Sequence, residues 1–116
     1  MKNFPAFMRI DQNKINPSSQ YTKNIEGYVY DGVEGSQMAI WSCHEAHKTR
    51  EHSHEFDEYM VCVFGQYTVY MDNKEFILNP GDELYIPTGL VHHGECIADT
   101  RTIHAFGGKR AERVKF

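Results

Sequence analysis

The sequence predicts an all-β protein built as a sandwich or a barrel of short strands. From about residue 26 onward, short runs rich in Tyr, Val, Ile, Phe and Trp alternate with Gly, Pro, Asn and Asp. No window stands out as a long amphipathic helix. The chain has 116 residues, which is the size of one domain, so we expect the strands to share a single core.

The candidate strands follow one another at short intervals and are separated by turn-forming residues. They cover 26–31, 36–44, 58–64, 67–71, 75–79, 83–86, 92–98 and 100–106. The turn signals between them are Asp31-Gly32, Gly65-Gln66, Asp72-Asn73, Asn79-Pro80-Gly81 and Pro87-Thr88-Gly89. We expect residues 1–25 to form an N-terminal arm with room for one edge strand, 26–106 to form the barrel, and 107–116 to form a frayed tail or a single helical turn.

Composition and charge exclude several classes of protein. Hydrophobic residues make up 41% and charged residues 24% of the chain, which are globular values. A net charge of -4 argues against a nucleic-acid partner. The sequence shows neither an apolar stretch of about 20 residues nor a signal peptide, so we expect no membrane partner and a cytoplasmic location. In that compartment Cys43, Cys62 and Cys96 are expected to be free thiols.

Four residues form a candidate metal-binding set. His52 and His54 are two apart, so in a strand they point to the same face. Glu58 follows at an even offset, and His92 comes directly after a Pro-x-Gly turn. Three imidazoles and one carboxylate suit a divalent transition metal. An H-x-H pair alone is a weak signal in a chain with seven histidines, so the residues around it matter.

The frame around these residues resembles the paired motifs of the cupin superfamily. The first segment reads His52-Ser53-His54, three residues, Glu58, six residues and Gly65; the second reads Gly81, five residues, Pro87-Thr88-Gly89, two residues and His92. The resemblance implies a single double-stranded β-helix, or jelly-roll barrel. This chain departs from the family pattern at two positions, with Ala46 in place of Gly and Cys96 in place of Asn. Neither position is normally a ligand.

Several further side chains are candidates for the pocket. Met60, Cys62 and Phe64 share the parity of Glu58 and should line the cavity if that strand is regular. Cys96 shares the parity of His92, and His104 lies near the end of a strand, so each is a weaker candidate for the pocket.

The remaining histidines and one arginine have competing interpretations. His44 and His47, with Cys43, form either a second metal site or, as we prefer, loop residues at a cavity rim. His93 should point away from His92, toward the surface or an interface. Arg101 either pairs with a substrate carboxylate or forms a surface salt bridge, and we favour the salt bridge.

The resemblance implies a metal-dependent protein that acts on a small oxygen-bearing organic molecule by dioxygenase- or isomerase-like chemistry. Glu58 would be a ligand that detaches to act as a catalytic base. The metal, whether iron, manganese, nickel or zinc, stays open. The alternatives are a noncatalytic ligand-binding or sensing cupin and a metal-free barrel. We expect metal occupancy to fall below about pH 6, as free imidazole protonates, and small members of the family suggest a homodimer.

Overall fold

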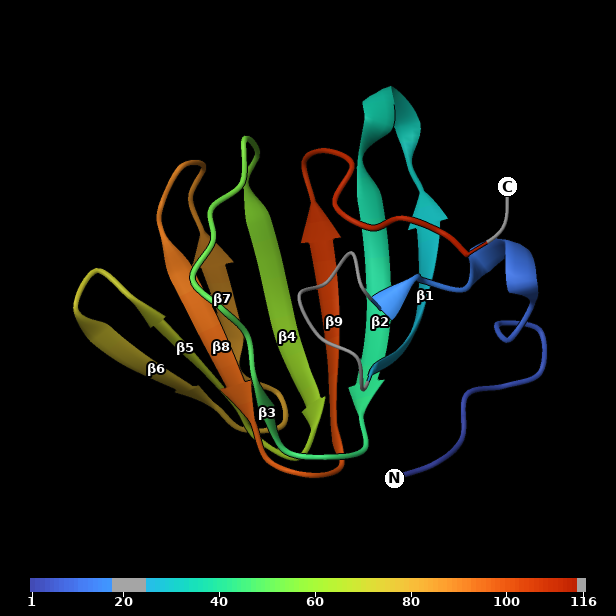
Figure 1. Cartoon of the computed structure of the whole chain (residues 1–116), viewed down its shortest axis with the longest axis horizontal. Helices are drawn as coiled ribbons and strands as arrows, with labels where there is room; N and C mark the ends of the chain where they lie inside the picture. The colour runs from blue at the N-terminus through green and yellow to red at the C-terminus, as the bar shows by residue number, and fades with distance from the viewer. Residues whose placement is uncertain (18–24, 115–116) are drawn as a thin grey trace.

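The computed structural model describes residues 1–17 and 25–114, and it consists of two antiparallel sheets that face each other (Figure 1). The five-stranded sheet has the order β1 (Ile25–Asp31), β2 (Gln37–Cys43), β9 (Thr100–Phe106), β4 (Glu58–Phe64) and β7 (Glu83–Ile86). The four-stranded sheet has the order β3 (His47–Lys48), β8 (His92–Cys96), β5 (Tyr67–Met71) and β6 (Lys74–Leu78). Short 3-10 helices span Asp11–Asn13 and Val33–Gly35.

The all-β prediction is confirmed, and each of the eight expected strands is present with its ends within two residues of the expected ones. The sequence missed β3, a strand of two residues that pairs with the end of β8. A strand this short carries too little alternation to be recognised from its own residues.

The core lies between the sheets because alternate residues of the strands point inward. In β9, Thr100, Thr102, His104 and Phe106 are buried while the residues between them are half-buried. One apolar cluster gathers around Trp41 and Phe106, and a second gathers around Met60 and Val69. Residues of both clusters line the same pocket, so the apolar core is continuous with the wall of the candidate site.

Turn residues set the hairpins as their chemistry predicts. Asp72 and Asn73 both have positive φ angles, of 53° and 57°, and they join β5 to β6. That pair of angles matches the two-residue turn whose twist suits a hairpin. Gly81 has a φ of 95°, and the Asp82 N–H donates to the Asn79 carbonyl at 2.9 Å, which closes the expected Pro-Gly turn.

Gly65 is the glycine for which a side chain should be most costly. Its φ is 78°, and an added Cβ would lie 2.8 Å from the Thr100 Cα and 2.6 Å from the Asp99 carbonyl oxygen. Backbone strain and a clash with fixed backbone atoms therefore act together. We expect Gly65→Ala to lower the free energy of unfolding by about 2 kcal/mol, measured by urea denaturation. Gly35→Ala is the control, because its φ is 81° but an added Cβ meets nothing within 4 Å. Equal losses in the two variants would show that the Thr100 contact is unimportant.

Both terminal segments pack on the barrel, and this corrects the expectation of a frayed tail. Ala111 is fully buried, and the Gln37 side chain accepts the Ala111 N–H at 2.8 Å. Ile15, from the N-terminal arm, is 1% exposed and pairs with Arg113. The described parts of the N-terminal arm and of the C-terminal segment therefore pack against each other over the five-stranded sheet.

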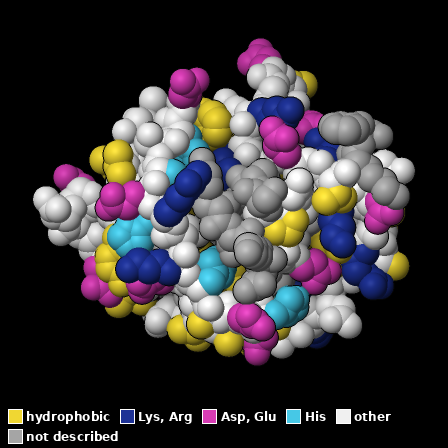
Figure 2. Space-filling model, viewed as in Figure 1, with side chains coloured by type: hydrophobic (Ala, Val, Ile, Leu, Met, Phe, Trp, Pro, Cys, Tyr) yellow, Lys and Arg dark blue, Asp and Glu magenta, His cyan; other side chains and the backbone are white. Residues whose placement is uncertain are grey.

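Surface charges are mixed rather than gathered. On the face shown in Figure 2, basic and acidic side chains are interspersed. Within the described ranges, no helix has the length and apolar character to cross a membrane. Among the residues that the structure describes, Arg101 has no carboxylate within salt-bridge distance, which corrects the expectation that we favoured: its guanidinium lies 3.8 Å from the centroid of the Phe4 ring and donates to the Ser42 hydroxyl and the Lys2 carbonyl.

Candidate metal centre

The two motif segments are hydrogen-bonded to each other. His52 and His92 form an isolated antiparallel bridge, with both N–H···O distances at 2.9 Å. The Gly89 N–H also donates to the His54 carbonyl at 2.9 Å, and Gly89 has a φ of 78°. The Pro-x-Gly turn therefore holds the backbone of the H-x-H segment directly. His52 and His54 lie in the connection between β3 and β4 rather than in a regular strand.

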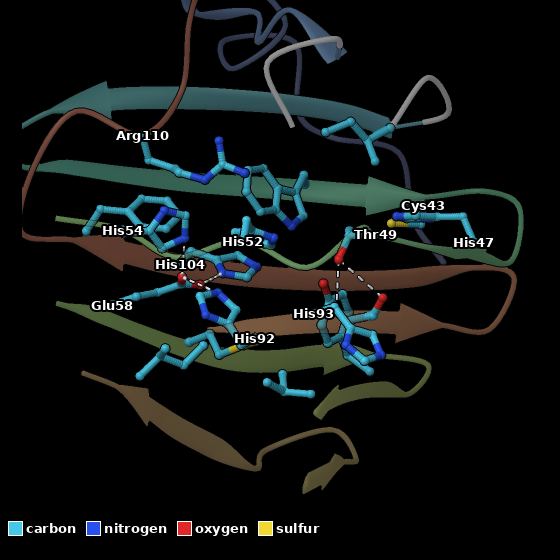
Figure 3. A pocket seen from close by; sticks show the side chains of 18 residues that line it. Cys43, His47, Thr49, His52, His54, Glu58, His92, His93, His104 and Arg110 are labelled. Atoms are coloured by element: carbon cyan, nitrogen blue, oxygen red, sulfur yellow. Dashed lines mark hydrogen bonds and ion pairs between the residues drawn. The ribbon is translucent and has the colours of Figure 1, made fainter. Parts of the chain in front are cut away.

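Three imidazoles converge inside the barrel (Figure 3). One ring nitrogen from each of His52, His54 and His92 lies within 4.8 Å of the other two. Their ring centroids are separated by 5.0 Å, 4.4 Å and 5.1 Å for the pairs 52–54, 52–92 and 54–92. The structure therefore brings together the three histidines that the spacing selected.

Backbone carbonyls fix the orientation of two of these rings. The Nδ1 of His52 hydrogen-bonds the Arg50 carbonyl at 2.8 Å, and the Nδ1 of His92 hydrogen-bonds the Leu90 carbonyl at 2.8 Å. A carbonyl can only accept, so the proton lies on Nδ1 and the lone pair on Nε2. Such bonds are typical of metal-ligating histidines. The Nε2 of His54 is buried without a hydrogen-bond partner, and the ring stacks on Phe56 at a 5.1 Å centroid distance.

Glu58 reaches the same point from the opposite sheet. Its Oε1 lies 3.3 Å from the His54 Nε2 and 3.9 Å from the His92 Nε2. Its Oε2 accepts a hydrogen bond from the His104 Nδ1 at 2.7 Å, and the other ring nitrogen of His104 lies 2.8 Å from the Thr102 hydroxyl. His104 thus holds one carboxylate oxygen while the other faces the histidines.

Burial and hydrogen bonding set the charge states of the cluster. Burial opposes ionisation of Glu58, but the hydrogen bond from His104 and the nearby His54 ring outweigh it and hold the pKa of the carboxyl below its usual range. Burial lowers the pKa of His52 to about 4, and it also lowers the pKa of His92. Neutral imidazoles beside an anionic carboxylate are the donor set that a divalent metal requires.

The residues present therefore fit a metal ion. The observation that tests the fit is the buried His54 Nε2, a polar atom that lacks a hydrogen-bond partner. Burying such an atom costs free energy unless something binds it. The Oε1 atom of Glu58 lies beside two of the three nitrogens, at 3.3 Å and 3.9 Å, but outside the group of donors that are all within 4.8 Å of one another.

The protein should retain its metal at a lower pH than a site made of histidines with unperturbed pKa values would. Because burial lowers the pKa of His52 to about 4, that ring stays neutral at pH 5 and requires no proton to be displaced. This revises the sequence-based expectation of loss below about pH 6. We expect the midpoint of metal release to lie below about pH 5, measured as metal content after dialysis at stepped pH. A midpoint near pH 6.5 would contradict the shift.

The predicted pocket residues divide into two groups. Met60 and His104 line the pocket beside the histidines. Phe64 is 45% exposed and lies outside it, because the pairing of β4 with β9 shifts register between Cys62 and Phe64 and ends the regular alternation. Cys62 is fully buried in the apolar cluster around Met60 and Val69 and is not part of the pocket lining.

The other histidines also differ from one another. His44 is exposed and pairs with Glu26 at 3.3 Å. His93 stacks on Tyr70, its neighbour across the β5–β8 pair. His47 lines the pocket, and its Nδ1 lies 3.2 Å from the sulfur of Cys96. Cys96 therefore packs near Cys43 and His47 rather than near His92.

Several pocket residues escaped the sequence analysis as site residues. Trp41 and Tyr67 line the cavity, as does Arg110 from the C-terminal segment (Figure 3). Trp41 lies 4.4 Å from the His104 ring, centroid to centroid. The glycine at position 94 was an indirect signal that a large side chain packs there, because a side chain at Gly94 would overlap the Tyr67 ring.

Comparisons with known proteins agree with this architecture. Residues 40–106 match the family model described as Cupin domain. Quercetin 2,3-dioxygenase of Bacillus subtilis (strain 168) is 44% identical over 43 residues, which are 36% of this chain and 13% of that protein. The aligned part thus spans about an eighth of the dioxygenase.

Solved structures of low sequence identity share the fold. KdgF from Halomonas sp. superposes with a TM-score of 0.68 at 20% identity, covering 75% of this chain and 81% of that one. An RmlC-like cupin from Shewanella frigidimarina NCIMB 400 gives a TM-score of 0.65 at 17% identity, covering 72% and 75%. These likenesses support the jelly-roll barrel.

Proposed function

Since this chain belongs to the cupin family, we propose that it is a metal-binding cupin that acts on a small oxygen-bearing organic molecule. The reaction we propose is of the dioxygenase or isomerase type. The observation that carries the proposal is that ring nitrogens of His52, His54 and His92 converge, and that one of them, the His54 Nε2, is buried and makes no hydrogen bond. The limited similarity to quercetin 2,3-dioxygenase supports the oxygen-using branch of the proposal.

The nitrogens of the three histidines and the Glu58 Oε1 would hold the ion. When bound, a transition metal there supplies a Lewis acid or a redox centre with open positions for an oxygen-bearing ligand. The protein keeps the His52 and His92 rings neutral by burying them, and it keeps Glu58 anionic mainly through the hydrogen bond from His104. On leaving the ion, the Glu58 Oε1 would accept a proton from a substrate hydroxyl while Oε2 stays bonded to His104.

The rest of the pocket determines which molecules fit. Met60, Val69, Ile86 and Phe106 give it apolar walls, which favour a substrate with a hydrocarbon or aromatic face and keep water from the site. Arg110 adds a cationic side chain to the same pocket. We therefore favour a ligand that combines a flat apolar part with adjacent oxygens, such as a phenol, an enol or an organic acid.

The proposal can be tested by measuring the metal content of the protein and then its reaction with candidate ligands. The full chain is purified without added metal and its metal content is measured. It is then reloaded separately with iron(II), manganese(II), nickel(II) or zinc(II). Each form is mixed with quercetin and with simpler enols, and both oxygen uptake and isomer formation are followed. Turnover that depends on one of the metals supports the proposal.

Two other outcomes would count against catalysis. Ligand binding without turnover in every metal form would favour a noncatalytic sensing cupin. A protein that neither retains nor regains metal would overturn the metal centre itself.

A further inference from the structure

A second group of side chains that could hold a metal ion lies toward the other end of the pocket, where Figure 3 labels two of its members, Cys43 and His47. Cys43 ends β2, His47 begins β3, and Cys96 ends β8. One donor atom from each of the three lies within 4.8 Å of the others. His47 and Cys96 are direct partners across the β3–β8 pair, and the Cys96 sulfur is 3.2 Å from the His47 Nδ1.

These separations suit tetrahedral coordination. With zinc–sulfur distances of about 2.3 Å and zinc–nitrogen distances of about 2.0 Å, two sulfurs would lie roughly 3.8 Å apart and a sulfur and a nitrogen roughly 3.5 Å apart. Small rotamer changes therefore bring all three donors onto one ion. Cys43 and Cys96 are 2% and 6% exposed, so the sulfurs are already held by packing.

We propose that Cys43, His47 and Cys96 form a second metal site, which binds zinc or another divalent ion that prefers sulfur ligands. Thiolate and imidazole donors select such ions over calcium and magnesium. Cys43 and His47 also line the pocket, so a fourth position would face the cavity. Three protein ligands with one open position are typical of zinc sites that exchange a bound ligand.

The site is distinct from the three-histidine centre. His92 and Cys96 are the first and last residues of β8. Four residues of strand span roughly 13 Å, so one ion cannot be shared. The two centres would therefore load independently, and the proposal does not depend on the proposed function.

The thiol chemistry is consistent with metal binding. A hydrogen bond from Cys43 lowers the pKa of the Cys96 thiol, burial opposes the shift, and the bond from His47 adds to it. The same bond, together with burial, raises the pKa of the Cys43 thiol, so Cys43 would lose its proton only as an ion binds. The thiolate is the form that binds metal. The backbone pairing of β3 and β8 holds His47 against this sulfur before any ion arrives.

Cobalt(II) is the probe, because thiolate ligands give it a charge-transfer band that imidazole ligands do not. The reduced, metal-free full chain is titrated with cobalt(II). We expect two equivalents to bind, one for each group of ligands, and the thiolate band to accompany one of them. Zinc(II) should then displace cobalt and protect Cys43 and Cys96 from alkylation.

Variants assign the band to this site. Cys96→Ser should lose the band and one equivalent, whereas His54→Ala should lose the other equivalent and keep the band. Cys62→Ser is the matched control, since Cys62 is fully buried but is not part of the group. Should Cys96→Ser fail to fold, His47→Gln changes a half-buried side chain instead, and it should weaken the thiolate-associated cobalt binding by about 100-fold.

Two results would overturn the proposal. One is cobalt binding to the reduced wild-type chain without a thiolate band. The other is a Cys43–Cys96 disulfide that persists in excess reductant, detected as a mass two hydrogens lower, since those sulfurs would then be unable to bind metal.

Discussion

A His54→Ala variant should lose its metal and keep its fold. The substitution removes a buried ring nitrogen that makes no hydrogen bond and has only an ion-pair contact with the Glu58 Oε1 at 3.3 Å, and Glu58 keeps its shorter bond from His104 at 2.7 Å. Its ring contributes a stack on Phe56, whose loss is expected to cost about 1 kcal/mol. Metal affinity should fall by more than about 100-fold, since even residues that only support a ligand change it by 10- to 100-fold.

The measurements are metal content after dialysis and thermal unfolding in a chelator. His44→Ala is the matched control, because His44 is exposed and pairs only with Glu26 among the contacts described for it. It should retain metal at the wild-type level. Wild-type affinity in His54→Ala would contradict the assignment of this ring as a ligand.

His104→Phe should destabilise the metal-free protein more than any other substitution considered for this site. His104 is 2% exposed, stacks on Phe106 and contacts the tilted Trp41 ring, so phenylalanine preserves most of the packing. It cannot, however, donate to the Glu58 Oε2, now held at 2.7 Å. Leaving the buried Glu58 carboxylate without its shortest hydrogen bond costs about 3 kcal/mol, and we expect Tm to fall by about 10 °C.

The pH dependence gives this prediction a definite sign. In the wild type the pKa of Glu58 is lowered, so its stabilising contribution is present above the unfolded pKa of about 4.3 and is lost as the pH falls toward the folded pKa. In the variant, burial dominates and raises the pKa of Glu58. The difference in unfolding free energy between the two proteins should therefore be largest near pH 7 and should narrow as the solution is acidified.

Two further variants separate charge from packing. Adding Glu58→Gln to His104→Phe should recover part of the lost stability, because the uncompensated charge is removed. Glu95→Gln is the surface control: Glu95 accepts from Tyr70 at 3.2 Å and pairs with an exposed Lys48, so its loss should cost less than about 1 kcal/mol. A Tm change under about 2 °C in His104→Phe would show that Glu58 does not depend on this bond.

Features with a local cause could be predicted from the sequence. Gly65 and Gly81 occupy positions with positive φ because adjoining apolar runs leave room only for tight turns. The strands were visible because inward-facing and outward-facing residues alternate within each one. His52, His54 and His92 could be selected together because the residues around them resemble the paired cupin motifs.

Features that join distant segments could not be predicted in this way. Alternation along β4 predicts that Phe64 faces the core. A register shift between β4 and β9 turns its ring to solvent instead. Packing of the C-terminal residues depends on Gln37, 74 positions away along the chain from Ala111. No local pattern encodes such a contact.

The sequence by itself determined eight of the strands and their turns, because each follows from the conformational preference of neighbouring residues, and it indicated the three histidines, because the residues around them resemble the paired cupin motifs. Only the tertiary structure decided that His104 anchors Glu58 and that Cys43, His47 and Cys96 meet. Those contacts bring together residues from β4 and β9, and from β2, β3 and β8, whose proximity is set by strand pairing and sheet packing rather than by spacing.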